Sequence, residues 1–300
     1  MRKLIECIPN FSEGRRQDVI DRVAATVRGA AGVRLLDVSP NPDHNRTVLT
    51  FVGEPEAVAE AAFACTAEAI RLIDMNKHKG EHPRMGAMDV VPFVPVAGVT
   101  MDDAVALANG VGKRIADELE VPVYLYAAAA TSPARKRLPD VRQGQYEGLI
   151  EAITRPERKP DFGQPKMHPT AGATAVGARP PLIAFNVNLG TTNLQIAKNI
   201  AKGLRESSGG LVNVQALGVD LAAEELVQVS MNLLDYTHTP IHRAYELVRL
   251  EAERYGVPVV ASEIVGLVPM DALASAADFY LRLKDFNRNQ VLEARLLEED

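Results

Sequence analysis

The feature that most constrains the fold is an alternation of strands and helices that occurs twice along the chain. Each half reads as strand, helix, two strands, helix and strand, and the first half has one extra helix. In both halves a late helix leads directly into the tripeptide VPV, at residues 121–123 and 257–259. The β-α-β-β-α-β order is typical of a ferredoxin-like unit. The sequence therefore predicts an α/β (α+β) protein with two ferredoxin-like subdomains and a ligand cleft between them.

Local signals agree with this alternation. Residues 15–30 carry an apolar stripe at helical spacing, formed by Val19, Ile20, Val23 and Val27. Thr100 precedes an acidic first turn, which favours the start of another helix there. Residues 132–181 are rich in proline, glycine and charge, which is typical of a connector. We therefore expect an N-terminal subdomain at residues 1–178, which includes the connector, and a C-terminal subdomain at residues 179–300.

The bulk composition excludes several classes of protein. The 300 residues include 33 basic and 39 acidic side chains, a net charge of −6, so we expect no binding to nucleic acid. No stretch approaches the ~18 consecutive apolar residues of a membrane-spanning helix, and the start lacks the apolar core of a signal peptide. Cys7 and Cys65 lie far apart without CxxC spacing. We expect two reduced thiols in a cytoplasmic protein that does not bind membranes.

The stretch MNKHKGEHPRMGAMDVVPF, which starts at Met75, holds two histidines four residues apart. A zinc site would need His78 and His82 on one face of a helix, but the glycine between them and Pro83 after them disfavour a helix. The simpler interpretation of His78 is a loop residue that satisfies nearby backbone groups. His82 lies between Glu81 and Pro83, and an imidazole titrates near neutral pH. An acid–base role for His82 is therefore open beside a structural one.

A second polar cluster, formed by Asp43, His44, Asn45 and Arg46, lies in a turn before a predicted strand. In one interpretation the Asp and Asn side chains simply bond to the backbone of the turn. In the other, the turn faces a substrate and Arg46 binds a carboxylate. The glycine-rich stretch from Gly172 fits neither a GxGxxG nor a P-loop pattern, so no nucleotide site is predicted.

Several long stretches match one known family in order along nearly the whole chain. They are CIPNFSEGR, NRTVLTFVG, HKGEHPRMGAMDVVPFVPV, QYEGL, PDFG, GATAVGARPPLIAFNVNL, VQVSMNLLDYTHTPIHRAYE and VPVVASEIVGLVP. In these stretches the chain resembles the glutamate formiminotransferase (glutamate formimidoyltransferase) family, the tetrahydrofolate-dependent enzymes of histidine breakdown. The resemblance implies two ferredoxin-like α/β subdomains with folate bound between them. It implies a stand-alone transferase, without the cyclodeaminase to which this domain is fused in animals.

The resemblance also implies roles for individual residues. The family's catalytic histidine falls on His82, and its folate-binding segment falls on Gly163, Gln164, Pro165, Lys166, Met167, His168, Pro169, Thr170, Ala171 and Gly172. The family has a carboxylate where Ser39 stands and an aromatic residue where Ala171 stands. Asp43 is our candidate for the missing carboxylate. Further candidates for contact with substrate or folate are Asn10, Arg46, Glu81, Arg84 and Arg179.

The implied chemistry explains why a histidine is needed. N5 of tetrahydrofolate attacks the amidine carbon of N-formimino-L-glutamate, which gives 5-formiminotetrahydrofolate and L-glutamate. An imidazole with an ordinary pKa of ~6.5 takes a proton from N5 and gives one to the leaving nitrogen. The amidine is cationic, so Asp43 or Glu81 is the expected carboxylate partner. Tetrahydrofolate is expected as co-substrate, and no metal is required.

Other functions stay open at this point. Formyl transfer or 5-formyltetrahydrofolate processing could use the same folate site, because one oxygen in place of one nitrogen hardly alters a pocket. A folate-binding module without catalysis would bind folate without turnover. A metal hydrolase would use His78 and His82. The sequence does not fix the oligomeric state, and a homodimer is one assembly that it leaves open.

Overall fold

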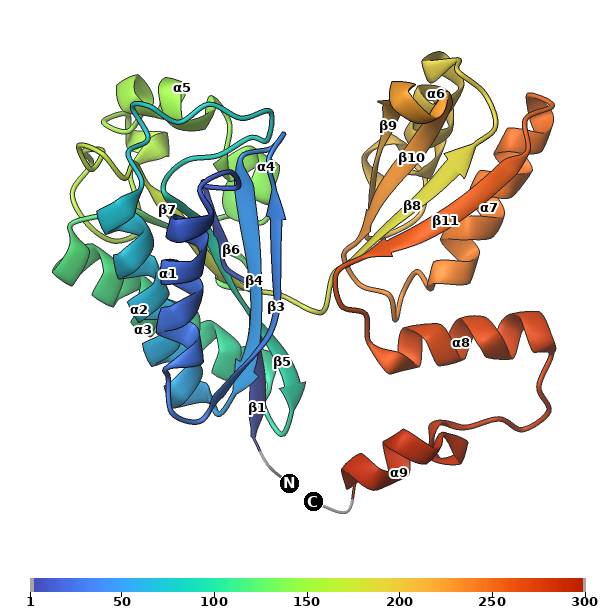
Figure 1. Cartoon of the computed structure of the whole chain (residues 1–300), viewed down its shortest axis with the longest axis horizontal. Coiled ribbons are helices and arrows are strands. Elements are labelled where there is room, and N and C mark those ends of the chain that lie inside the picture. The colour runs from blue at the N-terminus through green and yellow to red at the C-terminus, as the bar shows by residue number, and fades with distance from the viewer. Residues whose placement is uncertain (1–2, 299–300) are drawn as a thin grey trace. The chain divides into compact units, whose positions relative to one another are not determined.

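The computed structural model describes residues 3–298, which form two compact units (Figure 1). Unit 1 extends to Arg179, and unit 2 begins at Pro180. Each unit combines one β-sheet with helices, so the predicted α/β class is confirmed. The ferredoxin-like assignment and the ligand cleft between the halves stay predictions.

Unit 1 contains one mixed sheet in the order β1-β4-β2-β5-β7-β6, with β3 also paired to β4. Its strands are β1 (Leu4–Cys7), β2 (Asn10–Phe11), β3 (Val33–Asn41), β4 (Arg46–Gly53), β5 (Met88–Ala97), β6 (Val123–Ala127) and β7 (Thr174–Ala178). β7 runs parallel to β5 and β6, and the other pairings are antiparallel. The helices and 3-10 turns are α1 (Gln17–Arg28), α2 (Pro55–Leu72), α3 (Met101–Leu119), η1 (Pro133–Arg135), α4 (Leu138–Val141), α5 (Gln145–Ala152) and η2 (Pro156–Arg158).

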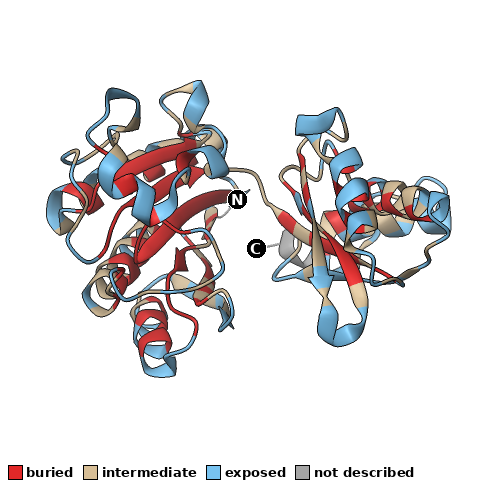
Figure 2. Ribbon diagram, turned by 90° about the horizontal axis from the view of Figure 1, so that it is seen from above, coloured by how far each residue is buried: buried red, intermediate tan, exposed pale blue. Residues whose placement is uncertain are grey.

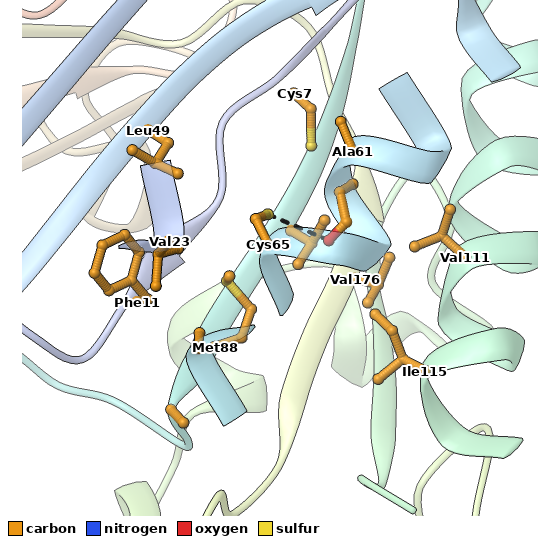
Figure 3. Packing of buried hydrophobic residues seen from close by; sticks show 14 of the residues in the cluster. Cys7, Phe11, Val23, Leu49, Ala61, Cys65, Met88, Val111, Ile115 and Val176 are labelled. Carbon is orange, nitrogen blue, oxygen red and sulfur yellow. Dashed lines mark hydrogen bonds between the residues drawn. The ribbon is translucent and has the colours of Figure 1, made fainter. Parts of the chain in front are cut away.

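The main core of unit 1 lies between this sheet and helices α1, α2 and α3. Buried residues follow the strands and the inner faces of the helices (Figure 2). Cys7 and Cys65 point into this core among apolar side chains (Figure 3), and both are free, as predicted. The Cys65 thiol donates to the carbonyl of Ala62 at 3.3 Å. Burial raises the pKa of both thiols, which are therefore protonated at neutral pH.

Two local predictions for unit 1 are confirmed. The apolar stripe of α1 is buried, because Val19, Ile20, Val23 and Val27 all face the sheet core. Thr100 is the N-cap of α3: its hydroxyl accepts from the amide of Asp103 at 3.1 Å, and the Asp103 carboxylate accepts from the amide of Thr100 at 2.9 Å. This reciprocal capping box satisfies two amides that the helix itself leaves without partners.

Segment 132–181, which the sequence predicts to be a connector within the N-terminal subdomain, contains regular structure that the prediction did not include. It contributes α4, α5 and the parallel strand β7, and it buries Tyr146 and Leu149. Gly177 explains how a glycine-rich strand fits inside the sheet: a Cβ there would lie 2.5 Å from the carbonyl oxygen of Tyr126. A composition rich in glycine and proline therefore conceals a central strand here.

Unit 2 follows the predicted order of strand, helix, two strands, helix and strand. Its sheet is antiparallel throughout, in the order β11-β8-β10-β9. The elements are β8 (Ile183–Leu189), α6 (Leu194–Leu204), η3 (Glu206–Ser208), β9 (Val214–Leu221), η4 (Ala222–Glu224), β10 (Leu226–Leu233), α7 (Ile241–Arg254), β11 (Val259–Val265), α8 (Met270–Leu281), η5 (Arg288–Gln290) and α9 (Leu292–Glu298). Helices α6 and α7 pack on one face of the sheet. None of the helices within residues 3–298 has the length and apolar character needed to cross a bilayer.

Candidate active site

The histidine loop, residues 73–87 between α2 and β5, lies against segment 163–172. Backbone hydrogen bonds join them at both ends of the loop, from Met75 N to Thr170 O at 2.7 Å and from Ala87 N to Ala171 O at 2.8 Å. The approach is close: a Cβ on Gly86 would lie 2.5 Å from Ala171 O. The fold thus brings together two predicted site segments that are far apart in the sequence.

The turn that carries the second polar cluster is fixed to the same loop through Asn45. Asn45 has a positive φ of 47°, which lets its side chain face inward from the turn. Its Oδ1 accepts from the amide of Gly14 at 2.9 Å, and its Nδ2 donates to the carbonyl of Lys79 at 3.0 Å. A Cβ on Gly80 would lie 2.2 Å from the carbonyl oxygen of His44, so only glycine fits there. The predicted backbone role is confirmed for Asn45.

His78 is a structural residue of the loop, which confirms the simpler interpretation. Its Nε2 donates to the carbonyl of Asn45 at 2.8 Å, and its Nδ1 accepts from Nε of Arg84 at 3.3 Å. Both ring nitrogens are therefore engaged. The Arg84 guanidinium also forms a two-pronged ion pair with Glu147, at 2.9 and 2.6 Å. Within residues 3–298, no group of three or more His, Cys, Asp or Glu side chains is arranged to hold a metal ion.

His82 occupies a half-buried position beside His44, with the two ring centroids 5.5 Å apart. Its Nδ1 is buried and has no hydrogen-bond partner in the part of the chain that the structure describes. Burial, reinforced by the charges of Arg46 and Arg142, lowers the pKa of His82 to about 3. The imidazole is therefore neutral at physiological pH. This lowered pKa differs from the ordinary value of ~6.5 that the sequence suggests.

Two residues near His82 were not recognised as site residues from the sequence. Asp89 is only 1% exposed and forms an ion pair with Arg142. Its other oxygen accepts from the amide of Met85 at 2.8 Å, so both of its oxygens are bound. The lone carboxylate of Asp89 within the apolar run MDVVPF was the signal that could have indicated this pair.

Arg46 lies near this pair, and within the described residues 3–298 no ion pair neutralises its charge. Burial lowers the pKa of Arg46 to about 10, and the charge of Arg142 adds to the effect while Asp89 opposes it. Its buried Nε has no hydrogen-bond partner among residues 3–298. A buried guanidinium N–H without an acceptor is costly, and an incoming carboxylate would satisfy it.

The predicted carboxylates lie at the surface. Asp43 and Glu81 are both exposed, and the amide of Glu81 donates to the carbonyl of Asp43 at 3.3 Å. A third carboxylate, Asp37 on β3, accepts from the hydroxyl of Ser39 at 2.5 Å. Asp37 thus places a carboxylate next to the position where the family is expected to carry one.

The other predicted residues occupy different surroundings. Asn10 is 5% exposed on β2 and donates to the carbonyl of Ile8 at 2.7 Å. Burial raises the pKa of Tyr126, and the charges of both Arg179 and Arg142 oppose that rise. Arg179 therefore lies within electrostatic reach of the same tyrosine as Arg142.

Segment 163–172 presents some of its predicted residues to solvent and buries others. The exposed residues are Gly163, Gln164, Lys166, Pro169 and Thr170, and the partly buried ones are Pro165, Met167 and His168. Nδ1 of His168 accepts from the amide of Ala171 at 2.9 Å, which closes the turn. Ala171 is 1% exposed and belongs to the core of unit 1, and Gly172 is buried as well. The side chain of Ala171 therefore offers no surface to a ligand.

Comparison with known proteins matches the same family along nearly the whole chain. Residues 4–179 match the family model described as the formiminotransferase domain, N-terminal subdomain, and residues 184–297 match the formiminotransferase domain. The chain is 49% identical to a glutamate formimidoyltransferase from Streptococcus pyogenes serotype M1, covering 99% of this chain and 100% of that protein. It is 50% identical to a glutamate formimidoyltransferase from Thermoplasma acidophilum, covering 98% of this chain and 97% of the relative.

The match to two-domain relatives is confined to part of their length. The formimidoyltransferase-cyclodeaminase of Rattus norvegicus is 51% identical over 93% of this chain, but the alignment covers 53% of the rat protein. The full-length matches are thus to stand-alone proteins. Both family models and the high identity over nearly every residue lead to one conclusion: the chain belongs to the formiminotransferase family.

Proposed function

We propose that this chain transfers the formimino group from N-formimino-L-glutamate to N5 of tetrahydrofolate, with His82 as general acid and base. The observation that carries the proposal is the neutral, half-buried imidazole of His82, whose Nδ1 has no partner within residues 3–298. The name of two full-length relatives, glutamate formimidoyltransferase, supports the reaction. Tetrahydrofolate is the co-substrate in this proposal.

The proton transfers follow from the bonds that form and break. N5 attacks the amidine carbon and gives a tetrahedral carbon that bears three nitrogens. His82 accepts the proton that N5 loses. The resulting imidazolium then protonates the glutamate nitrogen, which leaves as a neutral amine while the amidine is restored on N5.

A base with a pKa near 3 is weak, and we propose that bound substrate raises the pKa of His82. General base catalysis is most efficient when the pKa lies near the working pH. Arg46 and Arg142 both lower the pKa of His82. A glutamate carboxylate bound at Arg46 would offset that positive charge and raise the pKa of His82. We therefore assign Arg46 to the carboxylate of N-formimino-L-glutamate.

The remaining candidate residues are assigned either to contact with a ligand or to positioning of the site. Segment 163–172 is the proposed folate-binding element, through its exposed residues and its main chain. Arg84 is a positioning residue in this proposal, because its guanidinium is already bound to Glu147 and His78. Asp43 is the proposed partner of the cationic amidine, and Asp37 is the rival for that role because it bonds to Ser39. Asn10, Glu81 and Arg179 stay proposed ligand residues without an assigned group.

The direct test mixes the chain with tetrahydrofolate and N-formimino-L-glutamate and follows 5-formiminotetrahydrofolate by absorbance and mass. A parallel reaction offers N-formyl-L-glutamate as donor. We expect turnover with the formimino donor and much slower turnover with the formyl donor. Turnover with the formyl donor alone would replace the proposed reaction with formyl transfer, and folate binding without turnover would indicate a non-catalytic module.

A further inference from the structure

Unit 1 contains a second imidazole beside His82 that has no role in the proposed reaction. His44 lies in the turn between β3 and β4, and its ring centroid is 5.5 Å from that of His82, with 49° between the ring planes. Ring pairs with centroids about 4.5–7 Å apart are in contact. The whole of β4 and α2 separates the two residues along the chain. The fold of unit 1 therefore builds a pair of neighbouring imidazoles from two loops.

The four histidines of unit 1 differ in what their ring nitrogens bind. His78 uses both ring nitrogens, and His168 uses Nδ1, in bonds that hold their loops in place. Nδ1 of His82 is buried without a partner, and no hydrogen bond within residues 3–298 holds the ring of His44. The two imidazoles that lie side by side are thus the two that keep ring nitrogens available for a proton.

The position of His44 suits contact with both His82 and water. The amide of His44 donates to Oδ1 of Asn41 at 2.8 Å, so the main chain fixes this part of the turn and the ring is not needed for it. His44 is half-buried, whereas Nδ1 of His82 is shielded from solvent. A proton can therefore pass between water and His44 more directly than between water and Nδ1 of His82.

The charged side chains around this turn do not bond to either ring. Arg15 donates from Nε to the carbonyl of Pro42 at 2.7 Å. Asp43 lies in the turn itself, and Glu81 approaches from the histidine loop, where its amide donates to the carbonyl of Asp43 at 3.3 Å. In the described part of the chain, neither carboxylate accepts a hydrogen bond from an imidazole of the pair. A path for protons through the two rings is thus not blocked by a bound carboxylate.

The proposed reaction takes up one proton in each turnover. The donor substrate enters with a cationic amidine, and N5 of tetrahydrofolate enters neutral. The products are a cationic amidine on N5 and the amino group of glutamate, which is mostly protonated at neutral pH. The proton that N5 loses stays within the site, because His82 passes it to the leaving nitrogen. The additional proton on the amino group must therefore come from water.

We propose that His44 is a proton-relay residue that carries this proton from water to His82, and through His82 to the amino group of glutamate. The inference rests on the proposed function, which assigns the proton transfers at the substrate to His82. An imidazole can accept a proton at one ring nitrogen and release one from the other. As an N–H bond of His44 breaks, one forms on His82, and His44 regains its proton from water. His44 acts through His82 in this proposal, so it is a positioning residue rather than a catalytic one.

The test variants are His44→Gln and His44→Ala, because both keep the main-chain bond of the turn. We expect kcat to fall about 10-fold in each, less than the ~10²-fold or more expected for loss of direct proton transfer, with both KM values unchanged. Added imidazole is a small proton carrier, and it should restore kcat of His44→Ala in proportion to its concentration. A purely structural loss would not respond to imidazole. The control is His238→Ala, an exposed histidine whose replacement should leave kcat unchanged with or without imidazole.

Exchange of the His82 ring proton with water tests the relay without turnover. NMR of isotope-labelled protein measures this exchange, which should be slower in His44→Gln than in the wild-type chain. Unchanged exchange would reject the relay, as would an unchanged kcat or a lost kcat that imidazole does not restore. If the wild-type chain transfers no formimino group but exchange slows in His44→Gln, the relay between the two imidazoles stands and the proposed function fails.

Discussion

The polar groups of unit 1 and unit 2 differ in sign although each unit is a sheet with helices packed against it. In unit 1, the charges of Arg46 and Arg142 act on a neutral imidazole, and the buried carboxylate of Asp89 forms an ion pair with Arg142. In unit 2, neutral amides surround the single carboxylate of Glu263. Similar architecture therefore supports opposite preferences. The charges of the first cluster oppose protonation of His82, and in the second cluster neutral amides donate to a carboxylate.

The largest effect should come from removing the imidazole itself. His82→Ala should lose about 10²- to 10⁴-fold in kcat, because proton transfer in both directions is lost, while tetrahydrofolate still binds. Steady-state kinetics and an equilibrium folate titration measure the two quantities. His238→Ala is the matched control, since His238 is exposed and pairs only with Asp235 within residues 3–298. Near-normal turnover in His82→Ala would remove His82 from the mechanism. The polar cluster of unit 1 would then have no catalytic role that distinguishes it from unit 2.

Arg46 and Arg142 should differ in role: Arg46 should bind a substrate, and Arg142 should stabilise the fold. Arg46→Met should raise KM for N-formimino-L-glutamate about 10- to 100-fold with little loss of stability, because its charge has no committed partner. Arg142→Met should lower the free energy of unfolding by about 3 kcal/mol, because it leaves the buried carboxylate of Asp89 unpaired. Kinetics and urea denaturation give the two readouts.

The control for both is Arg137→Met, an exposed arginine whose contact with Asp140 is 3.9 Å long. Equal losses of stability in Arg46→Met and Arg142→Met would contradict this division. Both substitutions remove a positive charge that acts on His82, so NMR titration should show a higher pKa for His82 in each. An unchanged pKa would show that burial alone sets it.

Much of the fold could be predicted because periodicity reports which face of an element is buried. The stripe of α1 and the cap of α3 are local signals, and both elements form where the sequence placed them. Strand β7 was concealed because small residues and glycines give no alternation to detect. Its position between β5 and β6 depends on tertiary packing rather than on local preference.

The candidate site was only partly accessible from the sequence. His82 and Arg46 could be named because polar side chains in turns next to strands are good candidates for binding and catalysis. The pairing of Arg142 with Asp89 spans 53 residues, so only the folded chain shows it. The low pKa of His82 depends on that same folding, because both arginines that lower it come from other segments.

A smaller effect should appear in the dependence of stability on pH. The pKa of His82 is lowered from 6.5 to about 3 by burial and the arginines. Between these values the unfolded chain binds the proton more readily, so stability falls as the pH drops through this window, by at most about 1.4 kcal/mol per pH unit. His82→Gln should reduce the loss between about pH 7 and pH 5, as measured by urea midpoints. His238→Gln should not, and an identical loss in all three proteins would show that His82 does not titrate in this way.

The smallest effect should distinguish the carboxylates that could face the amidine. An exposed carboxylate contributes at most about 1 kcal/mol to a charge interaction, or about fivefold. Asp43→Asn should therefore lower kcat/KM for N-formimino-L-glutamate about fivefold, and Asp37→Asn should change it less. Asp220→Asn on β9 controls for general effects of charge removal. The reverse order would transfer the role to Asp37, whose bond to Ser39 already holds it in place. Equal, negligible effects would exclude both Asp43 and Asp37 as the partner of the amidine, and Glu81 would be the carboxylate left to test.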